Sequence, residues 1–558
     1  MMKRDLNRLA DNVYDVLVIG GGIYGVFAAW DAILRGLSVA LVEKGDFGHA
    51  TSSNSLRIIH GGIRYLQSLD IRRARQSMDE QLILKRIAPH LIKPLPFLIP
   101  TYGHLMRGKE LLYFAISLYK LIGFDRNLFG ESSYNLPIGR TISREECIQA
   151  IPDIDSKGLT GGVIFYDCQV PNAERLIMAV ARSAANAGAD MANYVEVNGF
   201  AREKNRVVGV KVKDVLNGDG FEIRTKNIIN TCGPWLNNLL SMLDSHYPVS
   251  NHGLSKAFNL LLNRNITNNY AVGIYSHIQN KGTAQLLGRK SRYLYITPWN
   301  GRSLLGTEHL QSGGDPDNLQ IHKDEMQTFL EELSSSYPAA GLKLQDISFV
   351  YAGLLPTVIS RKGNVRLSSK YKVYDHGREQ GLEGLISVRG VKFTEARYVA
   401  ERVVDLVFTK LNRTPSVSYT RKTPVHGGDI EGFSDYLSKE TIKRDNLLTP
   451  EILHEIICDY GTAYPELLKY LTGELEFNEA IIDKTSLIKP MVIHAVREEM
   501  AQKLSDVIFR RTNMGMDGYA TGDNLKNVAR IMAKELNWNR ERLNKEINDA
   551  TGKFFHLP

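Results

Sequence analysis

The stretch DVLVIGGGIYGVFAAW, residues 15–30, joins an apolar run to a glycine-rich turn and a helical pattern. Its opening residues predict a buried parallel strand, because β-branched side chains follow one another there without polar alternation. The segment VFAAWDAILRG (26–36) predicts a helix that ends at Gly36, since glycine readily adopts the left-handed conformation of a C-terminal cap. A second strand, LSVALVE (37–43), follows and ends at Glu43. The order strand, helix, strand predicts a parallel α/β unit.

The turn carries the spacing G-x-G-x-x-G at Gly20, Gly22 and Gly25. The first glycine permits a tight turn, the second lets the backbone approach a pyrophosphate, and the third lets the helix pack against the strand. Glu43 lies about twenty residues further on, where a carboxylate can accept the ribose hydroxyls of an adenosine and disfavours a 2'-phosphate. We therefore expect Gly20, Gly22, Ile23, Gly25 and Glu43 to bind a dinucleotide. The motif alone leaves FAD and NAD open.

The next segment, EKGDFGHATSSNSLRIIHGGIRYLQ (43–67), is rich in glycine, serine and threonine where an NAD-binding domain would proceed to its next helix and strand. Small hydroxyl groups and backbone amides along an extended path suit the pyrophosphate and ring edge of a flavin. The segment therefore favours FAD. An NAD-dependent dehydrogenase stays the alternative, and it predicts a colourless protein. The residues of this segment expected to contact FAD are Lys44, Thr51, Ser52, Ser53, Ser55 and Arg57.

The chain has 558 residues, which exceeds the usual limit of one core, so two or three structural units are expected. Its net charge of +8 is spread along the chain, which favours a small anionic substrate or an anionic membrane surface over nucleic acid. The four cysteines lie far apart and show no zinc-binding spacing, which indicates a reduced, cytoplasmic setting and no metal site. The N-terminal residues show no signal-peptide pattern.

The segment ELLYFAISLYKLIGF (110–124) is the most membrane-like stretch of the chain. It is too short to span a bilayer, and it contains Lys120. Two interpretations stay open: an interfacial helix, whose flanking basic residues would face anionic headgroups, and a buried helix. We therefore expect a cytoplasmic protein, with a peripheral position on the inner face of the cell membrane as the alternative.

Two parts of the hydroxyl-rich segment, ATSSNS and IHGGIRYL, resemble the signature of the FAD-dependent glycerol-3-phosphate dehydrogenase and oxidase family. Further blocks resemble that family in the same order, and they extend the resemblance over nearly the full chain. These blocks are FYDCQVPNAERL (165–176), IINTCGPW (228–235), VKFTEAR (391–397), YGTAYPELLKYL (460–471) and AVREEMAQKLSDVIFRRT (495–512).

The resemblance implies an α/β fold in three parts: an FAD-binding Rossmann-like domain of the glutathione-reductase and D-amino-acid-oxidase type, an antiparallel β-sheet that caps the substrate, and an α-helical C-terminal domain. The implied boundaries are 12–70, 165–250 and 340–412 for the FAD-binding domain, 71–164 and 251–339 for the cap, and 420–558 for the helical domain. In the helical part, an apolar stripe at steps of three and four residues predicts one helix face packed in the core. The stripe consists of Ile493, Val496, Met500, Leu504, Val507 and Ile508.

The implied activity is oxidation of the secondary hydroxyl of glycerol 3-phosphate, or of a close analogue, to dihydroxyacetone phosphate by hydride transfer to flavin N5. Electrons would pass to quinone, and an oxidase that returns them to oxygen is the open alternative. The catalytic candidates implied by the resemblance are His60, Arg64 and Lys392. The substrate-binding candidates are Arg64, Tyr65, Asn259, Arg389 and Lys392. The resemblance adds to the expected FAD contacts Gly233, Trp235 and Thr394.

Two positions depart from the family pattern. The segment YAGLLPT places Leu355 where the family has an arginine that binds the substrate phosphate, and SKAFN places Asn259 where it has a histidine. We expect Arg389 to take over anion binding, because it lies next to the expected flavin edge in SVRGVKFT. The departures keep two alternatives open: an enzyme for a different polyol phosphate or hydroxy acid, and a catalytically silent, membrane-associated flavoprotein. A monomer and a homodimer both stay open.

Overall fold

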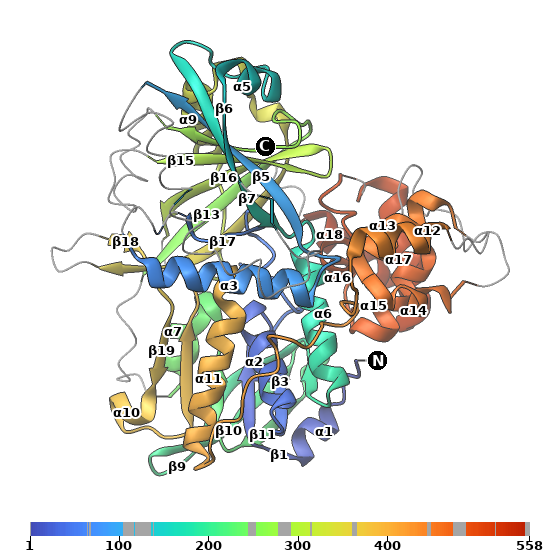
Figure 1. The fold of residues 1–558 in the computed structure, drawn as a ribbon. Helices are drawn as coiled ribbons and strands as arrows, with labels where there is room; N and C mark the ends of the chain where they lie inside the picture. The colour runs from blue at the N-terminus through green and yellow to red at the C-terminus, as the bar shows by residue number, and fades with distance from the viewer. Residues whose placement is uncertain are drawn as a thin grey trace.

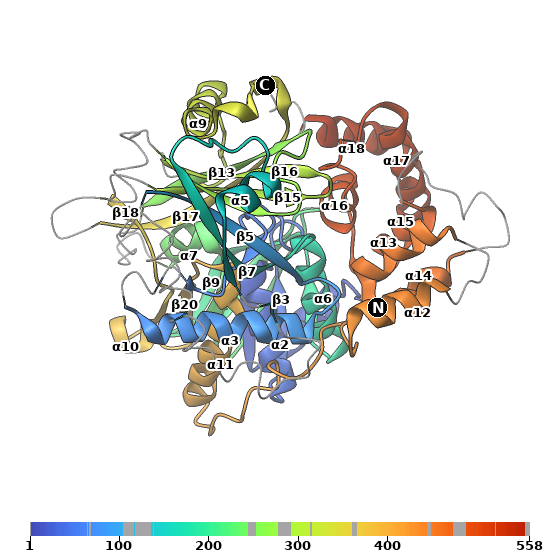
Figure 2. The same ribbon diagram turned by 45° about the horizontal axis from the view of Figure 1, so that its top comes forward.

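The computed structural model of the chain has three parts that differ in secondary structure: an α/β unit, a large mixed sheet and a bundle of helices (Figures 1 and 2). This architecture confirms the fold class expected from the sequence. The described residues are 2–63, 65, 69–103, 117, 136–137, 139–243, 253–276, 292–312, 315–359, 365–442, 448–471, 487–518 and 520–552.

The α/β unit is built on a six-stranded sheet in the order β19-β20-β12-β2-β3-β8. Its strands are β2 (Val16–Ile19), β3 (Val39–Val42), β8 (Asp190–Ala192), β12 (Ile228–Asn230), β19 (Lys372–Asp375) and β20 (Leu385–Arg389). All neighbours run parallel except β19 and β20, which are antiparallel. The strands β2 and β3 are buried along their whole length, as a continuous apolar run predicts.

Helices cover one face of this sheet, and a second sheet covers the other. The helices are α2 (Ile23–Leu34), α6 (Ala173–Asn186) and α11 (Ala396–Lys410), and their apolar residues share a core with Val16, Val18, Val39 and Leu41. The second sheet has the order β1-β11-β10-β9, with the bounds Val13–Tyr14, Gly220–Thr225, Arg206–Asp214 and Val195–Glu203. With α1 (Leu6–Asp11) and α7 (Leu236–Ser241), it encloses Leu17, Ile19, Ala40 and Val42. Gly36 has φ +84°, which confirms the predicted end of the first helix.

The capping part is a ten-stranded sheet in the order β18-β17-β13-β16-β15-β14-β5-β7-β4, with β6 paired to β7. Its strands are β4 (Ile58–Ile59), β5 (Lys93–Tyr102), β6 (Arg140–Ile142), β7 (Leu159–Gln169), β13 (Leu254–Leu262), β14 (Ala271–Tyr275), β15 (Tyr293–Trp299), β16 (Arg302–Gln311), β17 (Ile347–Ile359) and β18 (Val365–Leu367). All of its pairings are antiparallel except β14 with β5. The helices α5 (Arg144–Ala150) and α9 (Lys323–Ser336) pack on it through a second core.

Four strands of the capping sheet lie wholly or partly within the ranges predicted for the FAD-binding domain. They are β4, the end of β7, β17 and β18. The strand β17 belongs to the capping sheet because it pairs with β13. At β7 the difference arises because this strand pairs with β5 along almost its full length and then leads directly into α6 of the α/β unit. One continuous segment therefore serves both parts, and the sequence shows no break between them. The helix α3 (Ile71–Ile87) runs across the junction of the two parts (Figure 1).

The helical domain comprises α12 (Phe433–Ile442), α13 (Pro450–Tyr460), α14 (Pro465–Leu468), α15 (Lys489–Glu499), α16 (Leu504–Asp506), a π-helical turn (Val507–Arg511), α17 (Gly522–Leu536) and α18 (Arg540–Gly552). The prediction of a single helix through the apolar stripe is wrong, although the stripe itself lies against the core. Helix α15 ends at Met500, which has φ 56°, and the Asp506 carboxylate accepts hydrogen bonds from the backbone N–H groups of Gln502 and Lys503. This polar cap starts a new helix and turns the chain.

Candidate active site

A cavity of about 1130 Å³ lies between the α/β unit and the capping sheet. The glycine turn, the hydroxyl-rich segment and residues 388–394 line it from the α/β side, and β13, β16 and β17 line it from the capping sheet. Ligands of open α/β sheets bind at the carboxyl ends of the strands, and this cavity lies beyond the carboxyl end of β2. The sequence elements singled out above therefore meet in one place.

The glycine turn forms a close-packed cradle at one side of the cavity. Gly20 has φ +105°, and a Cβ atom there would lie 2.8 Å from the carbonyl oxygen of Thr231. A Cβ atom on Gly25 would lie 1.8 Å from the carbonyl oxygen of Gly20. Gly22 is the N-cap of α2, so the positive end of this helix faces the cavity. The cradle fits the pyrophosphate of a dinucleotide, because a side chain at these positions would fill the space or clash.

Glu43 is held in place at the end of β3. Its Oε2 accepts a hydrogen bond of 2.7 Å from the Gly21 N–H, and its Oε1 accepts one of 2.8 Å from the Gly45 N–H. The imidazole Nδ1 of His49 lies 3.5 Å from Oε1. The carboxylate lines the cavity with lone pairs left over, so it is placed to accept the hydroxyls of a ribose.

The hydroxyl-rich segment uses its side chains to fix its own path. Ser52 Oγ accepts from the Ile23 N–H at 3.1 Å, and Ser53 Oγ donates to the Gly48 carbonyl at 2.5 Å. Thr51 Oγ1 both donates to the Leu354 carbonyl and accepts from the Leu354 N–H, at 3.1 and 3.2 Å, which ties the segment to β17. Thr51, Ser52 and Ser55 line the cavity, whereas Ser53 is buried beside it.

Lys44 and Trp235 close one end of the cavity together with Asp317, which the sequence analysis did not identify. The Lys44 Nζ lies 2.7 Å from Asp317 Oδ1, and the Trp235 Nε1–H donates to the same oxygen at 2.9 Å. The ammonium also lies 4.1 Å from the centre of the Trp235 ring. Gly233 lines the cavity beside them. Asp317 follows β16 of the capping sheet, so this contact bridges the two parts.

Arg57, like Ser53, does not line the cavity. Its guanidinium is fully buried and forms two hydrogen bonds of 2.8 Å with the Glu174 carboxylate, with a further bond of 3.2 Å to the Tyr351 hydroxyl. Burial alone would lower the pKa of Arg57, and Glu174 outweighs it and raises the pKa. The structure thus makes Arg57 an internal ion-pair partner of α6. The sequence could not indicate this, because the charge alone does not reveal burial.

His60 and Lys392 also line the cavity. The His60 Nδ1 lies 3.1 Å from Asp167 Oδ2, and the His60 N–H donates to Thr394 Oγ1 at 3.2 Å. The Lys392 Nζ lies 3.6 Å from Glu395 Oε1 and 4.1 Å from the centre of the Tyr65 ring. These contacts bring together four of the candidates, and Arg64 lies outside the described residues.

The backbone around Lys392 is fixed by Tyr24 of α2. The Tyr24 hydroxyl donates to the Lys392 carbonyl at 2.7 Å and accepts from the N–H groups of Val391 and Lys392 at 3.1 Å each. Burial raises the pKa of Tyr24, so the group stays a neutral phenol. Arg389 also lines the cavity, and one of its Nη atoms donates to the Tyr374 hydroxyl at 3.1 Å. The two cationic candidates of this segment are therefore both placed on the cavity wall.

The capping sheet supplies the remaining wall. Asn259 is buried, its Oδ1 accepts from Thr307 Oγ1 at 2.7 Å, and its Nδ2 donates to the Asn54 carbonyl at 3.4 Å. Its polar atoms are thus bound within the protein, although the residue lines the cavity. Leu355 and His309 lie on the same wall. His309 is a third histidine of the cavity lining, after His49 and His60, and no sequence motif distinguishes it.

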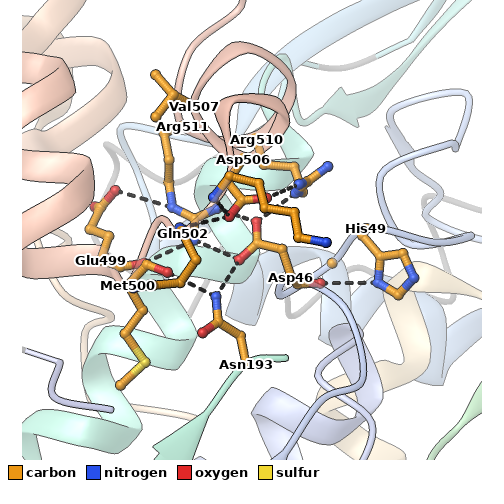
Figure 3. A network of polar contacts seen from close by, with 12 residues as sticks. Asp46, His49, Asn193, Glu499, Met500, Gln502, Asp506, Val507, Arg510 and Arg511 are labelled. Atoms are coloured by element: carbon orange, nitrogen blue, oxygen red, sulfur yellow. Dashed lines mark hydrogen bonds and ion pairs between the residues drawn. The ribbon is translucent and has the colours of Figure 1, made fainter. Parts of the chain in front are cut away.

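Behind the hydroxyl-rich segment, a buried ion-pair network joins it to the helical domain (Figure 3). The Asp46 carboxylate accepts a bond of 2.5 Å from Arg510 Nε and bonds of 2.8 and 2.9 Å from the two Nη atoms of Arg511. Asn193 Nδ2 donates to the same carboxylate at 3.0 Å. The carbonyl of Asp46 is paired with His49 Nδ1 at 3.0 Å. The helical domain therefore contacts the base of the segment that lines the cavity.

Comparison with known proteins agrees with this geometry. The family model "FAD dependent oxidoreductase" matches residues 15–405, and "C-terminal domain of alpha-glycerophosphate oxidase" matches residues 418–543. The chain is 32% identical to a glycerol-3-phosphate dehydrogenase of Synechocystis sp., with 98% of this chain and 97% of that protein covered. It is 30% identical to a mitochondrial glycerol-3-phosphate dehydrogenase of Mus musculus, with 96% and 72% covered.

Among solved structures, a glycerol-3-phosphate dehydrogenase from Bacillus halodurans in complex with FAD is similar, with a TM-score of 0.77 and 23% identity over 99% of this chain and 96% of that chain. An L-proline dehydrogenase from P. horikoshii has a TM-score of 0.52 at 20% identity and covers 75% of this chain. At these identities the two structures support the fold alone.

Proposed function

This chain belongs to the FAD dependent oxidoreductase family, and we propose that it oxidises the secondary hydroxyl of glycerol 3-phosphate to dihydroxyacetone phosphate. Its cofactor is FAD. The observation that carries the proposal is that one cavity combines the glycine cradle with His60 and Lys392. This arrangement supports a dinucleotide at one side and a small anionic alcohol at the other.

The cradle residues would hold FAD by its pyrophosphate, Glu43 would accept the ribose hydroxyls, and Thr394 with the hydroxyl-rich segment would contact the flavin. FAD supplies a two-electron acceptor when it is bound. His60 takes the proton of the substrate hydroxyl as the alcohol is oxidised. Lys392 places a positive charge in the same region, where it stabilises negative charge that develops during the reaction. The protein therefore contributes orientation, a base and positive charge.

Substrate binding must differ from the family pattern at Leu355. A leucine offers no hydrogen bond to phosphate, and a charge-assisted bond to phosphate is worth about 1.5–3 kcal/mol. Arg389 and Lys392 are the described cations that line the cavity nearest to the Thr394 segment, so we assign phosphate binding to them, together with Arg64. Leu355 and Asn259 also favour a second candidate substrate class, a different polyol phosphate or a hydroxy acid.

We assign a membrane quinone as the electron acceptor and a peripheral position on the membrane. Among the residues that the structure describes, no helix combines the length and apolar character needed to cross a bilayer. Leu69 and Ile71 are 74% and 49% exposed and stand beside the exposed Arg72, a combination that suits a bilayer surface with anionic headgroups. The segment 110–124, considered above as an interfacial helix, lies outside the described residues apart from Ser117.

The test is anaerobic reduction of the purified protein, which should be yellow. Glycerol 3-phosphate should bleach the flavin absorbance, and a soluble quinone analogue should restore it. Other polyol phosphates and hydroxy acids form the comparison set. If one of these compounds bleaches the flavin and glycerol 3-phosphate does not, that compound is the substrate. If no compound bleaches the flavin, the proposed activity is refuted. If oxygen alone rapidly reoxidises the reduced flavin, the electron acceptor is oxygen and not quinone.

A further inference from the structure

We propose that Asp167 is the residue that positions His60 as the base of the reaction. The inference rests on the proposed function in one respect, that His60 receives the hydroxyl proton. Asp167 lies in the block FYDCQVPNAERL, and it is separated from His60 by 107 positions along the chain. It does not itself line the cavity.

The pair has the geometry of a carboxylate that orients an imidazole. Asp167 Oδ2 lies 3.1 Å from His60 Nδ1, so it accepts a hydrogen bond from an Nδ1–H. The Asp167 side chain is 3% exposed, whereas the His60 side chain is 51% exposed and lines the cavity. The carboxylate thus approaches the ring from inside the protein, and the rest of the ring is accessible from the cavity.

Asp167 is itself held rigidly. Its Oδ1 accepts from the Gly61 N–H at 2.7 Å and from Gln81 Nε2 at 3.1 Å, and Gln81 also donates to the Ile59 carbonyl at 2.7 Å. These bonds connect β7, α3 and the segment that carries His60. A buried carboxylate with fixed donors on one oxygen has little freedom, so the second oxygen keeps a constant position relative to the ring.

The contacts around His60 also restrict its movement. Its backbone N–H donates to Thr394 Oγ1 at 3.2 Å, and the Phe97 ring has its centre 6.5 Å from the imidazole centre. The charged groups close to this position are Asp167 on β7 and the Lys392–Glu395 pair that flanks Thr394. Within the part of the chain that the structure describes, no lysine or arginine forms an ion pair with Asp167.

This arrangement determines which nitrogen acts as the base. With Nδ1–H donated to Asp167, the neutral ring carries its lone pair on Nε2, and Nε2 takes the substrate proton. The resulting imidazolium lies beside the buried carboxylate, which stabilises it. Asp167 therefore acts through His60 and fixes its orientation and tautomer.

The test is Asp167→Asn in the FAD-loaded enzyme. Asparagine keeps an oxygen for Gly61 and Gln81 and places an NH₂ group opposite His60 Nδ1, which forces the other tautomer. The rate constant of anaerobic flavin reduction by glycerol 3-phosphate should fall by about 10²–10⁴-fold. The pH profile of this rate should also differ between the wild type and the variant, because the variant holds the other tautomer. FAD content should stay unchanged. Gln81→Leu is the matched comparison, because it removes one hydrogen bond to the same carboxylate and keeps the charge and the Nδ1–H tautomer, so its rate should fall less than that of Asp167→Asn.

A purely structural role of Asp167 would leave the pH profile of the folded variant unchanged, so a rate within about fivefold of wild type with the same pH profile overturns the inference. A second measurement does not depend on the variant. In wild-type enzyme labelled with ¹⁵N-histidine, with His60→Gln to assign the signal, Nδ1 should be the protonated nitrogen at high pH. Protonation at Nε2 overturns the inference. If glycerol 3-phosphate does not reduce the wild-type flavin, the proposed substrate fails, and the ¹⁵N measurement still decides the role of Asp167.

Discussion

Replacement of Asp46 by asparagine should loosen the helical domain and weaken FAD binding at the same time. The Asp46 carboxylate is fully buried and receives three hydrogen bonds of 2.5–2.9 Å from Arg510 and Arg511. Removing one partner of a buried ion pair costs about 3–5 kcal/mol, because the other charge stays buried without compensation. Here Arg510 keeps the Asp506 carboxylate at 2.5 Å and Arg511 keeps Glu499 at 3.6 Å, so a loss of free energy of unfolding near the middle of this range is expected.

The effect on FAD follows from the position of Asp46 in the chain. It lies between Glu43 and Ser52, both of which line the cavity, and its carbonyl is paired with His49. If about a third of the lost free energy of unfolding appears as weaker FAD binding, the Kd for FAD rises about tenfold, since 1.4 kcal/mol corresponds to a factor of ten. Denaturant unfolding measures the first effect, and fluorescence titration of the apoprotein with FAD measures the second.

Lowering the pH should remove the contribution of the Asp46 ion pairs to the free energy of unfolding of the wild-type protein. Burial alone would raise the pKa of Asp46, but Arg511 and Arg510 outweigh it and hold the pKa below the usual range. A depressed carboxyl pKa contributes stability that is complete above the unfolded value of about 3.9 and is lost as the pH falls toward the folded value. The difference in stability between wild type and Asp46→Asn should therefore be constant near neutral pH and shrink below about pH 4.

The control is Asp523→Asn in the same domain, which removes an exposed ion pair with Lys526 and should leave unfolding unchanged. The reasoning would be refuted if Asp46→Asn unfolded at the same denaturant concentration as this control. If Asp46→Asn lost much stability but kept the Kd for FAD, only the proposed coupling between Asp46 and FAD binding would be refuted.

Three further outcomes are expected. Glu174→Gln should lower the free energy of unfolding by about 3–5 kcal/mol, because Arg57 would stay buried and charged. The KM for substrate should stay unchanged, and a shift in KM in a steady-state assay would contradict the internal role of Arg57. Arg389→Ala should raise the KM for glycerol 3-phosphate by about 10–100-fold, and an unaltered KM would exclude Arg389 from phosphate binding. Asp317→Ala should speed release of FAD by about two- to fivefold, because Lys44 loses a largely exposed partner, as followed by the fluorescence of free flavin; equal release rates would count against a closing role.

The sequence predicted the cradle well because its chemistry is local. The positions of Gly20, Gly22 and Gly25 relative to Glu43 follow from one strand, one turn and one helix, and the structure places all of them as expected. The serine and threonine residues of the next segment lie together at the cavity, and their contact with FAD stays a prediction. Ser53 shows the limit of this prediction, because its side chain is buried beside the cavity and does not line it.

The partners of these residues could not be predicted, because they come from distant parts of the chain. Asp317 is 273 positions from Lys44, and Arg510 is 464 positions from Asp46. Such pairs depend on how the sheets and the helical domain pack, which no local spacing encodes. The end of α15 just before Met500 could not be predicted either. The apolar stripe continues past this point, although Asp506 caps a new helix there.

The strand order of the six-stranded sheet has a consequence for biosynthesis. The strand β2 pairs with β12, and β12 pairs with β20, which ends at residue 389. The sheet therefore cannot be completed while the ribosome is still translating the middle of the chain. The strands β2 and β3 can pair with each other, but β12 and β20 are still missing on the other side of β2. Such non-local pairing is slow and leaves hydrophobic surface open to aggregation. Expression of this protein should depend on chaperones that protect the nascent N-terminal part until the later strands emerge.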